Sequence, residues 1–318
     1  MSEAPAPNLI VVLGPTASGK TRLAVRLAQL TGAEIISADS RQVFKGMDIG
    51  TGKDLAEYEV TRGTRIPVHL IDILPAGENY DVSRYMTDFT RVFCDITARG
   101  KRVILCGGTG LYIHALLKGY RDPGIPVDED LRAMFEKLPL SELQERLAQL
   151  PHALRLHADT STRKRTIRAL EKALYLQSND LPPIDLPELR AIVFGLALER
   201  DVRWQRIENR LNERLEAGLI AEAIQLTKAG VDPEKLRHYG LEYKYLADFL
   251  DGVIDMAGLR EGLNFAIRQF AKRQMTFFRK MEKDGITINW IDATLDIQTQ
   301  LSLVSRALLT AGLQLTTP

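Results

Sequence analysis

The chain has 318 residues, which is long for a single small domain and favours either one large domain with an insertion or two domains. Hydrophobic residues make up 45% and charged residues 26% of the sequence, close to the averages for globular proteins, and the net charge is +1. This balance excludes a polycation, so a nucleic-acid surface would have to be a local basic patch offset by acidic faces elsewhere.

The first third of the chain alternates apolar runs with amphipathic stretches. A helix is expected over residues 21–30, after a glycine-containing loop, and another over residues 80–99. Buried parallel strands are predicted at residues 9–13, 34–37, 68–73 and 102–106. The alternation predicts an α/β fold, in which a parallel sheet carries helices on both faces.

The pattern changes between residues 119 and 187, where prolines separate short amphipathic helices and no strand is evident. We interpret residues 119–187 as a small all-helical insertion domain. The catalytic core would then consist of residues 1–118 and 188–318. It resumes with a strand, a helical stretch and a last strand before a terminal helix, at residues 189–198, 201–281 and 286–290.

Cysteine usage and hydropathy indicate in which cellular compartment the protein is expected. Cys94 and Cys106 do not form a C-x-x-C pair, so neither indicates a zinc site. No apolar run approaches the roughly 20 residues that span a bilayer, and the first residues do not resemble a signal segment. The sequence therefore predicts a cytoplasmic protein that does not insert into a membrane.

Residues 14–21 (GPTASGKT) match the phosphate-binding loop motif G-x-x-x-x-G-K-[ST] in full, between a predicted strand and a predicted helix. Its amides and the helix N-terminus point at phosphate oxygens, Lys20 adds a positive charge, and the Thr21 hydroxyl can help to hold Mg²⁺. The loop indicates diphosphate binding; hydrolysis would also need a carboxylate for Mg²⁺, for which Asp39 and Asp72 lie near strand ends. The predicted contacts are Gly14, Pro15, Thr16, Ala17, Ser18, Gly19, Lys20 and Thr21.

Two polar segments follow predicted strands. Residues 37–42 (SADSRQ) place Asp39 beside the phosphate loop, where a carboxylate can accept a proton from an attacking nucleophile. Residues 107–112 (GGTGLY) place Thr109 opposite that loop, with its hydroxyl free to bond a leaving-group oxygen. Simpler roles remain open, a helix cap for Asp39 and a turn residue for Thr109.

Four motifs, GPTASGKT, SADSRQVFKGMDIGTGK, HLIDI and GGTGLY, resemble in order and spacing those of the tRNA dimethylallyltransferases. Residues 268–279 (RQFAKRQMTFFR) resemble the C-terminal RQ-x-A-KRQ-x-T-W-x-R helix of that family. The resemblance covers most of the chain. It implies transfer of a dimethylallyl group from dimethylallyl diphosphate to the exocyclic amine of the adenine 3′-adjacent to the anticodon in tRNA, with Mg²⁺ and with release of diphosphate.

The same resemblance assigns roles to residues. Asp39 would take the proton of the amine, while Lys20, Thr109 and Arg273 would stabilise the leaving diphosphate. The adenine must leave its stack, at a cost of roughly a few kcal/mol. The predicted partner is the anticodon stem-loop of tRNA, bound by a monomer through Asp39, Ser40, Arg41, Gln42, Thr109, Arg132, Lys164, Arg165, Arg168, Tyr243, Lys244, Lys272, Arg273 and Gln274.

Two basic segments support an RNA surface. Residues 163–168 (RKRTIR) contain four cations in six residues. Arg268, Lys272 and Arg279 fall on one stripe of a predicted helix whose opposite side is apolar and includes Phe270. Such stripes suit contacts to phosphates, although a solvated helix face is the ordinary alternative.

Three other functions stay open at this stage. A transferase acting on free adenine nucleotides would share the phosphate loop and the base, but would need neither the helical insertion nor the basic helices. A P-loop kinase or NTPase would have no role for residues 107–112 or 272–279. A non-catalytic tRNA-binding protein would not need Lys20 or Asp39. The sequence also departs from the family at Glu242, which stands where a glycine is usual.

Overall fold

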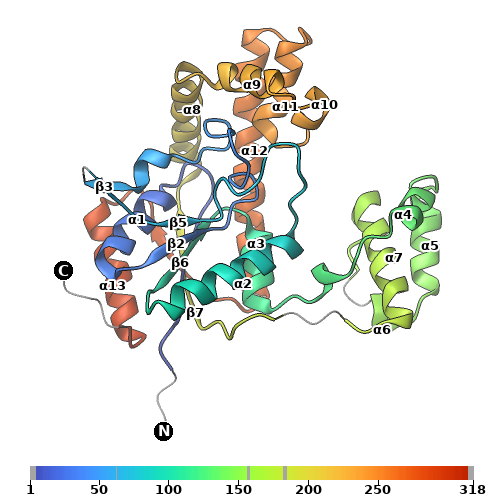
Figure 1. The fold of residues 1–318 in the computed structure, drawn as a ribbon, viewed down its shortest axis with the longest axis horizontal. Coiled ribbons are helices and arrows are strands. Elements are labelled where there is room, and N and C mark those ends of the chain that lie inside the picture. The colour runs from blue at the N-terminus through green and yellow to red at the C-terminus, as the bar shows by residue number, and fades with distance from the viewer. Residues whose placement is uncertain (1–4, 62, 156–157, 182–184, 314–318) are drawn as a thin grey trace. The chain divides into compact units, whose positions relative to one another are not determined.

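A six-stranded parallel sheet forms the centre of the computed structural model, which describes residues 5–61, 63–155, 158–181 and 185–313 (Figure 1). One of its two central strands is β1 (Leu9–Leu13), whose five side chains are all buried. The strand order is β5-β2-β6-β1-β7-β8, and every pair is parallel. The other strands are β2 (Glu34–Ser37), β5 (Val68–His69), β6 (Val103–Gly107), β7 (Ala191–Ala197) and β8 (Ile288–Asp292).

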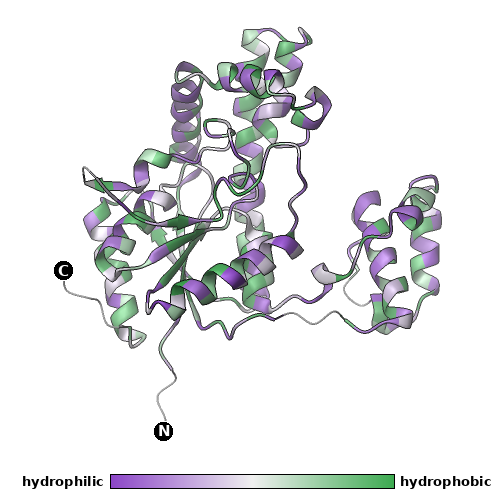
Figure 2. Ribbon diagram, viewed as in Figure 1, coloured by the Kyte–Doolittle hydropathy of each residue, from purple (hydrophilic) through white to green (hydrophobic). Residues whose placement is uncertain are grey.

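Helices cover both faces of this sheet, so the predicted α/β fold is confirmed. On one face α1 (Lys20–Thr31) packs with α13 (Ile297–Thr310), and their apolar stripes share a core with alternate residues of the strands. The other face is covered by α2 (Val82–Ala98) and, after β6, by α3 (Gly110–Lys118). Figure 2 shows the strands as hydrophobic and the helices as two-sided.

A group of helices follows β7 and has its own apolar core with the loop after β2. In Figure 1 it lies beyond one end of the sheet. Its long helix, α12, runs back from this group to the sheet and leads into β8. The members are α8 (Arg200–Glu216), α9 (Leu219–Lys228), α10 (Pro233–Leu236), α11 (Leu241–Leu250) and α12 (Met256–Lys283).

Contacts divide the chain into two units, Met1–Leu117 with Pro187–Pro318, and Lys118–Leu186. The second unit contains only helices among its described residues, around a small core that includes Phe135, Leu143 and Leu170. Its helices are η2 (Asp122–Gly124), α4 (Glu129–Phe135), α5 (Leu140–Gln149), α6 (His152–Arg155) and α7 (Arg163–Ser178).

One local expectation was wrong, and one segment has secondary structure that was not predicted. The strand predicted at residues 68–73 ends at His69, because Leu70 and Asp72 have φ angles of 61° and 56° and turn the chain out of the sheet. The polar stretch before it contains a short helix and a hairpin that the sequence did not reveal. These elements are η1 (Leu55–Tyr58), β3 (Glu59–Thr61) and β4 (Thr64–Arg65).

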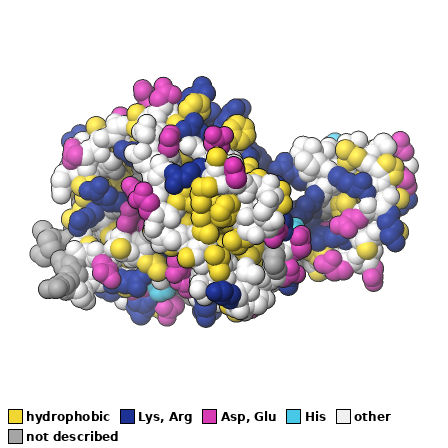
Figure 3. Space-filling view, turned by 90° about the horizontal axis from the view of Figure 1, so that it is seen from above, with side chains coloured by type: hydrophobic (Ala, Val, Ile, Leu, Met, Phe, Trp, Pro, Cys, Tyr) yellow, Lys and Arg dark blue, Asp and Glu magenta, His cyan; other side chains and the backbone are white. Residues whose placement is uncertain are grey.

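Surface charge and hydropathy agree with the composition. Figure 3 shows basic and acidic side chains interspersed over one face of the molecule. No helix in the described part of the chain is both long and apolar enough to cross a bilayer.

One charged cluster predicts how stability depends on pH. The buried Glu34 carboxylate accepts hydrogen bonds from Arg99 and contacts His69 at 2.7 Å, and these partners lower its pKa to about 2. Because that pKa lies below the ordinary 4.5, the stabilisation is complete above about pH 5 and is lost as the pH falls toward 2. Glu34→Gln should lower the free energy of unfolding by about 1 kcal/mol at pH 7, after allowance for the half-exposed Arg99.

Thermal unfolding of parent and variant between pH 2 and 7 measures this difference. The two curves should converge at low pH. Asp95→Asn is the control, because the Asp95 carboxylate bonds the same arginine from an exposed position. A difference that stays constant across the pH range would contradict the assignment.

Candidate functional site

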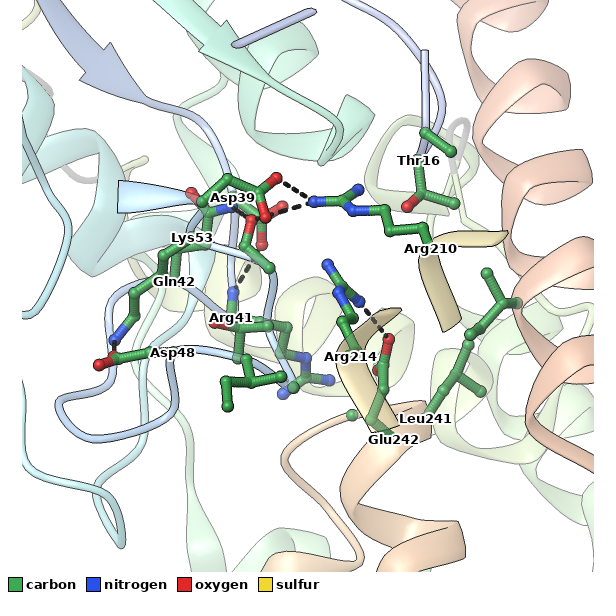
Figure 4. A pocket seen from close by; sticks show the side chains of 18 of the residues that line it. Thr16, Asp39, Arg41, Gln42, Asp48, Lys53, Arg210, Arg214, Leu241 and Glu242 are labelled. Atoms are coloured by element: carbon green, nitrogen blue, oxygen red, sulfur yellow. Dashed lines mark hydrogen bonds and ion pairs between the residues drawn. The ribbon is translucent and has the colours of Figure 1, made fainter. Parts of the chain in front are cut away.

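A cavity of about 1210 Å³ opens at the carboxyl ends of β1 and β2 (Figure 4). Five segments that are distant in sequence form its wall, which is typical of sites at the carboxyl edge of a parallel sheet. They are the loop before α1 with the first turn of that helix, parts of residues 39–57 after β2, one face of α8, residues 237–244 at and before the start of α11, and the middle of α12.

The phosphate loop has the backbone of an anion site. Ala17 and Gly19 have φ angles of 61° and 83°, which turn successive amides toward the same point. The helix α1 then begins at Lys20 without a side-chain cap, so its first N–H groups have no partner within the helix. Thr21 follows at the cavity wall. The loop therefore presents amides, an ammonium and a hydroxyl to one region.

Lys20 is half-buried, and burial lowers the pKa of its ammonium, while Cys106 and Asp39 oppose that shift and Arg210 reinforces it. Burial raises the pKa of the neighbouring Cys106 thiol to about 12. Burial thus leaves the ammonium form of Lys20 poorly solvated. An anion bound in the cavity would stabilise the Lys20 ammonium by a charge-assisted hydrogen bond, as water stabilises the ammonium of an exposed lysine.

Asp39 lies just beyond β2 on the cavity wall, as predicted, and one of its oxygens accepts a hydrogen bond from the Arg41 amide at 2.9 Å. The loop is fixed to the second glycine loop, because the Thr109 hydroxyl accepts from the Ser40 amide at 3.0 Å and the Thr109 amide donates to the Ala38 carbonyl. The Thr109 hydroxyl also donates to the Ser40 hydroxyl at 3.4 Å, so it is engaged with the loop that carries Asp39, whereas the sequence suggested that it is free.

Other side chains of this loop also form hydrogen bonds or ion pairs within the protein. The Gln42 amide donates to the Gly52 carbonyl at 3.0 Å and accepts from the Ser37 hydroxyl at 3.1 Å. The ammonium of the fully buried Lys53 contacts the carboxylates of Asp48 and Asp72. Asp72, which the sequence offered as a Mg²⁺ ligand, is used in this ion pair.

Glu222 of α9 anchors the far end of the same loop. Its carboxylate accepts from the amides of Asp48, Ile49 and Gly50 at 2.7–2.9 Å and from the Tyr243 hydroxyl at 2.6 Å. Tyr243 is only 1% exposed, and its pKa is raised by burial. The prediction that Tyr243 contacts tRNA does not fit this buried position, whereas the adjacent Lys244 is exposed at the cavity wall.

The helix α12 brings Arg273 and Phe270 to the cavity. Arg273 is exposed, and its guanidinium carbon lies 6.0 Å from the centre of the Phe270 ring. The sequence placed Phe270 on the buried side of this helix, but it is 39% exposed and lines the cavity. It lies just outside the buried stripe of Leu263, Ile267 and Ala271.

The sequence did not reveal the contribution of α8. Arg206, Arg210 and Arg214 follow one another at intervals of four residues, and all three line the cavity. Figure 4 shows Arg210 and Arg214 reaching into the space beside Asp39. This i, i+4, i+8 spacing in the sequence could have indicated that the three arginines lie on one face of a helix. Arg214 lies 3.5 Å from the carboxylate of Glu242, the residue that departs from the family pattern.

In the helical unit, Arg132 and Arg168, which were predicted to bind tRNA, form contacts within the protein. Arg132 forms a two-pronged ion pair with the buried Glu171, at 2.7 and 2.9 Å. Arg168 donates to the same carboxylate at 3.0 Å and to the Ile125 carbonyl at 2.6 Å. These guanidiniums are already engaged, so their removal would disturb the unit itself.

The other predicted basic residues are more accessible. Lys164 is exposed. Arg165 is also exposed, and its guanidinium forms an ion pair with Asp159 at 3.0 Å. Lys272 is exposed on α12. Arg268, from the same predicted stripe, instead pairs with Glu208 at 3.1 Å.

A family model described as IPP transferase matches residues 42–281. The chain is 48% identical to tRNA dimethylallyltransferase 1 of Porphyromonas gingivalis over 94% of its length and 98% of that protein, and 43% identical to tRNA dimethylallyltransferase 2 of Bacteroides fragilis over 95% and 98%. The chain belongs to the tRNA dimethylallyltransferase family. The resemblance seen in the motifs is confirmed, and the kinase, NTPase and free-nucleotide alternatives are not supported.

A solved member of the tRNA dimethylallyltransferase family agrees in fold. The crystal structure of a tRNA delta(2)-isopentenylpyrophosphate transferase from Staphylococcus epidermidis is 31% identical and has a TM-score of 0.67. The match covers 96% of this chain and 99% of that one. The match therefore extends over residues of both units.

The loop geometry predicts how an anion binds. Lys20→Met should weaken the binding of inorganic diphosphate, in the presence of Mg²⁺, by roughly 10- to 100-fold, because a partly buried charge-assisted hydrogen bond is lost. Calorimetric titration measures the affinity. Lys101→Met is the matched control, since Lys101 is exposed and precedes β6 at the opposite edge of the sheet. Equal affinities in parent and Lys20→Met would show that the loop does not use this ammonium.

Proposed function

We propose that the chain transfers the dimethylallyl group of dimethylallyl diphosphate to the exocyclic amine of the adenine 3′-adjacent to the anticodon in tRNA. Membership of the family supports this activity. The observation that carries the proposal is that the phosphate loop and Asp39 open into one cavity, next to the basic face of α8. That arrangement places an anion site beside a proton acceptor.

On the donor side, the diphosphate would lie on the amides of the phosphate loop with Lys20 and Arg273 around it, whereas Arg210 is already paired with Asp54. The carbon–oxygen bond to the allylic carbon breaks, and its electron pair leaves with the diphosphate. These groups meet more negative charge as that bond breaks, so they bind the transition state more tightly than the donor.

On the acceptor side, the amine is a weak nucleophile because its lone pair is delocalised into the adenine ring. The nitrogen forms a bond to the allylic carbon and gives one proton to the Asp39 carboxylate. One oxygen of Asp39 is fixed by the Arg41 amide, which leaves the other for this transfer. The exposed Phe270 ring offers a surface on which an unstacked base can pack.

Mg²⁺ fits the donor set of this cavity. The Thr21 hydroxyl is an oxygen ligand on the cavity wall, and Mg²⁺ usually combines one or two protein oxygens with phosphate oxygens and water. No group of three or more His, Cys, Asp or Glu side chains in the described ranges forms a metal site of its own. When bound, Mg²⁺ would add positive charge against the leaving diphosphate.

We further propose that tRNA is held by the accessible basic residues Arg41, Lys164, Arg165, Lys244 and Lys272. Phosphate contacts of this kind supply most of the affinity for nucleic acid. The protein would act as a monomer in the cytoplasm, where its RNA substrate is available.

The activity is tested by mass spectrometry of tRNA nucleosides after incubation with dimethylallyl diphosphate, which should reveal a dimethylallyl adenosine. In the same assay Asp39→Asn should reduce turnover by roughly 10²–10⁴-fold, with donor and tRNA affinity nearly retained. Added Mg²⁺ should not restore the rate. Rescue by Mg²⁺ would make Asp39 a metal ligand, and an unmodified tRNA with the parent protein would refute the activity.

The RNA surface is tested through salt dependence. A double variant, Lys164→Ala with Arg165→Ala, should reduce the slope of log affinity against log salt by roughly 1 for each lost phosphate contact. Turnover at saturating tRNA should change little. The charge-matched control is Lys137→Ala with Arg146→Ala, two exposed cations elsewhere in the helical unit. Identical slopes for both double variants and the parent would show that residues 164–165 are only a solvated surface.

A further inference from the structure

Gln274 connects the two glycine loops of the site. Its side-chain carbonyl accepts a hydrogen bond from the Thr16 amide in the phosphate loop at 2.9 Å. Its side-chain NH₂ donates to the Gly108 carbonyl in the second glycine loop at 3.0 Å. One buried amide on α12 thus bonds loops that precede it by 258 and 166 residues.

The second glycine loop is shaped to receive this helix. A Cβ added at Gly108 would lie 2.4 Å from the Gln274 amide nitrogen, and one added at Gly110 would lie 2.5 Å from the Phe277 ring. A side chain at Gly108 or Gly110 would displace Gln274 or Phe277 from its present position. The close approach of α12 is therefore a property of both partners, and not of the glutamine alone.

Burial separates this role from contact with RNA. The sequence grouped Gln274 with the residues that bind tRNA, but its side chain is only 7% exposed and both ends of its amide are engaged by backbone. The preceding residue, Arg273, is exposed to the cavity. Arg273 therefore faces the cavity, whereas the side chain of Gln274 faces the two glycine loops.

We propose that Gln274 is a positioning residue for the diphosphate, which fixes the phosphate loop and α12 at the spacing that lets Lys20 and Arg273 act on the same anion. The inference rests on the proposed function for the identity of the donor. Loss of the glutamine would leave the Thr16 amide and the Gly108 carbonyl without these partners. Such orphaned groups favour rearrangement of the loop.

The test compares two buried glutamines. Gln274→Met keeps the length of the side chain and removes both hydrogen bonds. Gln300→Met is the matched control, because Gln300 is also 7% exposed and donates to the Leu295 carbonyl at 2.7 Å, on a helix outside the cavity wall. Both variants should lose thermal stability, so a purely structural role predicts equal behaviour in every other assay.

The measurements are the affinities for inorganic diphosphate with Mg²⁺ and for tRNA, with turnover, at a temperature well below both unfolding midpoints. Gln274→Met should weaken diphosphate binding by roughly tenfold and lower turnover, while tRNA affinity stays within about twofold. Gln300→Met should change none of the three. Weakened tRNA binding with unchanged diphosphate binding would overturn the proposal in favour of the RNA role.

A second variant covers the case in which Gln274→Met does not fold. Gln274→Glu can still accept from the Thr16 amide, but its carboxylate cannot donate to Gly108 and adds negative charge beside the diphosphate. It should weaken diphosphate binding at least as much as the methionine variant. Parent-like diphosphate affinity in both variants would refute the positioning role. A parent protein that binds diphosphate without modifying tRNA would instead refute the proposed function and leave the positioning role intact.

Discussion

The site depends on how closely backbone segments approach one another at the carboxyl edge of the sheet. A Cβ at Gly107 would lie 2.2 Å from the Ala38 carbonyl oxygen, and one at Gly50 would lie 2.6 Å from the Tyr243 ring. These contacts allow the loop that carries Asp39 to lie between the second glycine loop and the helices after β7. Larger residues would separate Asp39 from the phosphate loop, although each segment could keep its own local structure.

Local features of the site could be predicted because their physical causes are local. The phosphate loop needs only its own glycines and the helix that follows, and the apolar runs at residues 9–13 and 34–37 became buried strands. The position of Asp39 followed from the end of β2. Where a strand was misjudged, at residues 68–73, the cause was the left-handed backbone of Leu70 and Asp72, which an apolar pattern does not indicate.

Long-range partners could not be predicted in the same way. Arg132 and Arg168 look like RNA ligands in sequence, but Glu171 and the Ile125 carbonyl satisfy their guanidiniums inside the helical unit. Glu222 belongs to no recognisable motif. Its carboxylate fixes the loop by accepting from three amides that precede it by 172–174 residues in the chain. A charge in a sequence indicates a possible contact, whereas only the fold decides whether protein or ligand provides it.

The buried Cys106 thiol has a consequence for oxidative chemistry. It lies next to Lys20, a neighbour that favours a thiolate, yet burial holds its pKa at about 12. The protonated thiol reacts slowly with peroxide and with disulfides, because the thiolate is the reactive form. Lys20 can therefore have a cysteine as its neighbour in the core without that thiol becoming a redox target. Cys94, exposed on α2 and away from the cavity wall, is the thiol that an oxidant or an alkylating label would reach first.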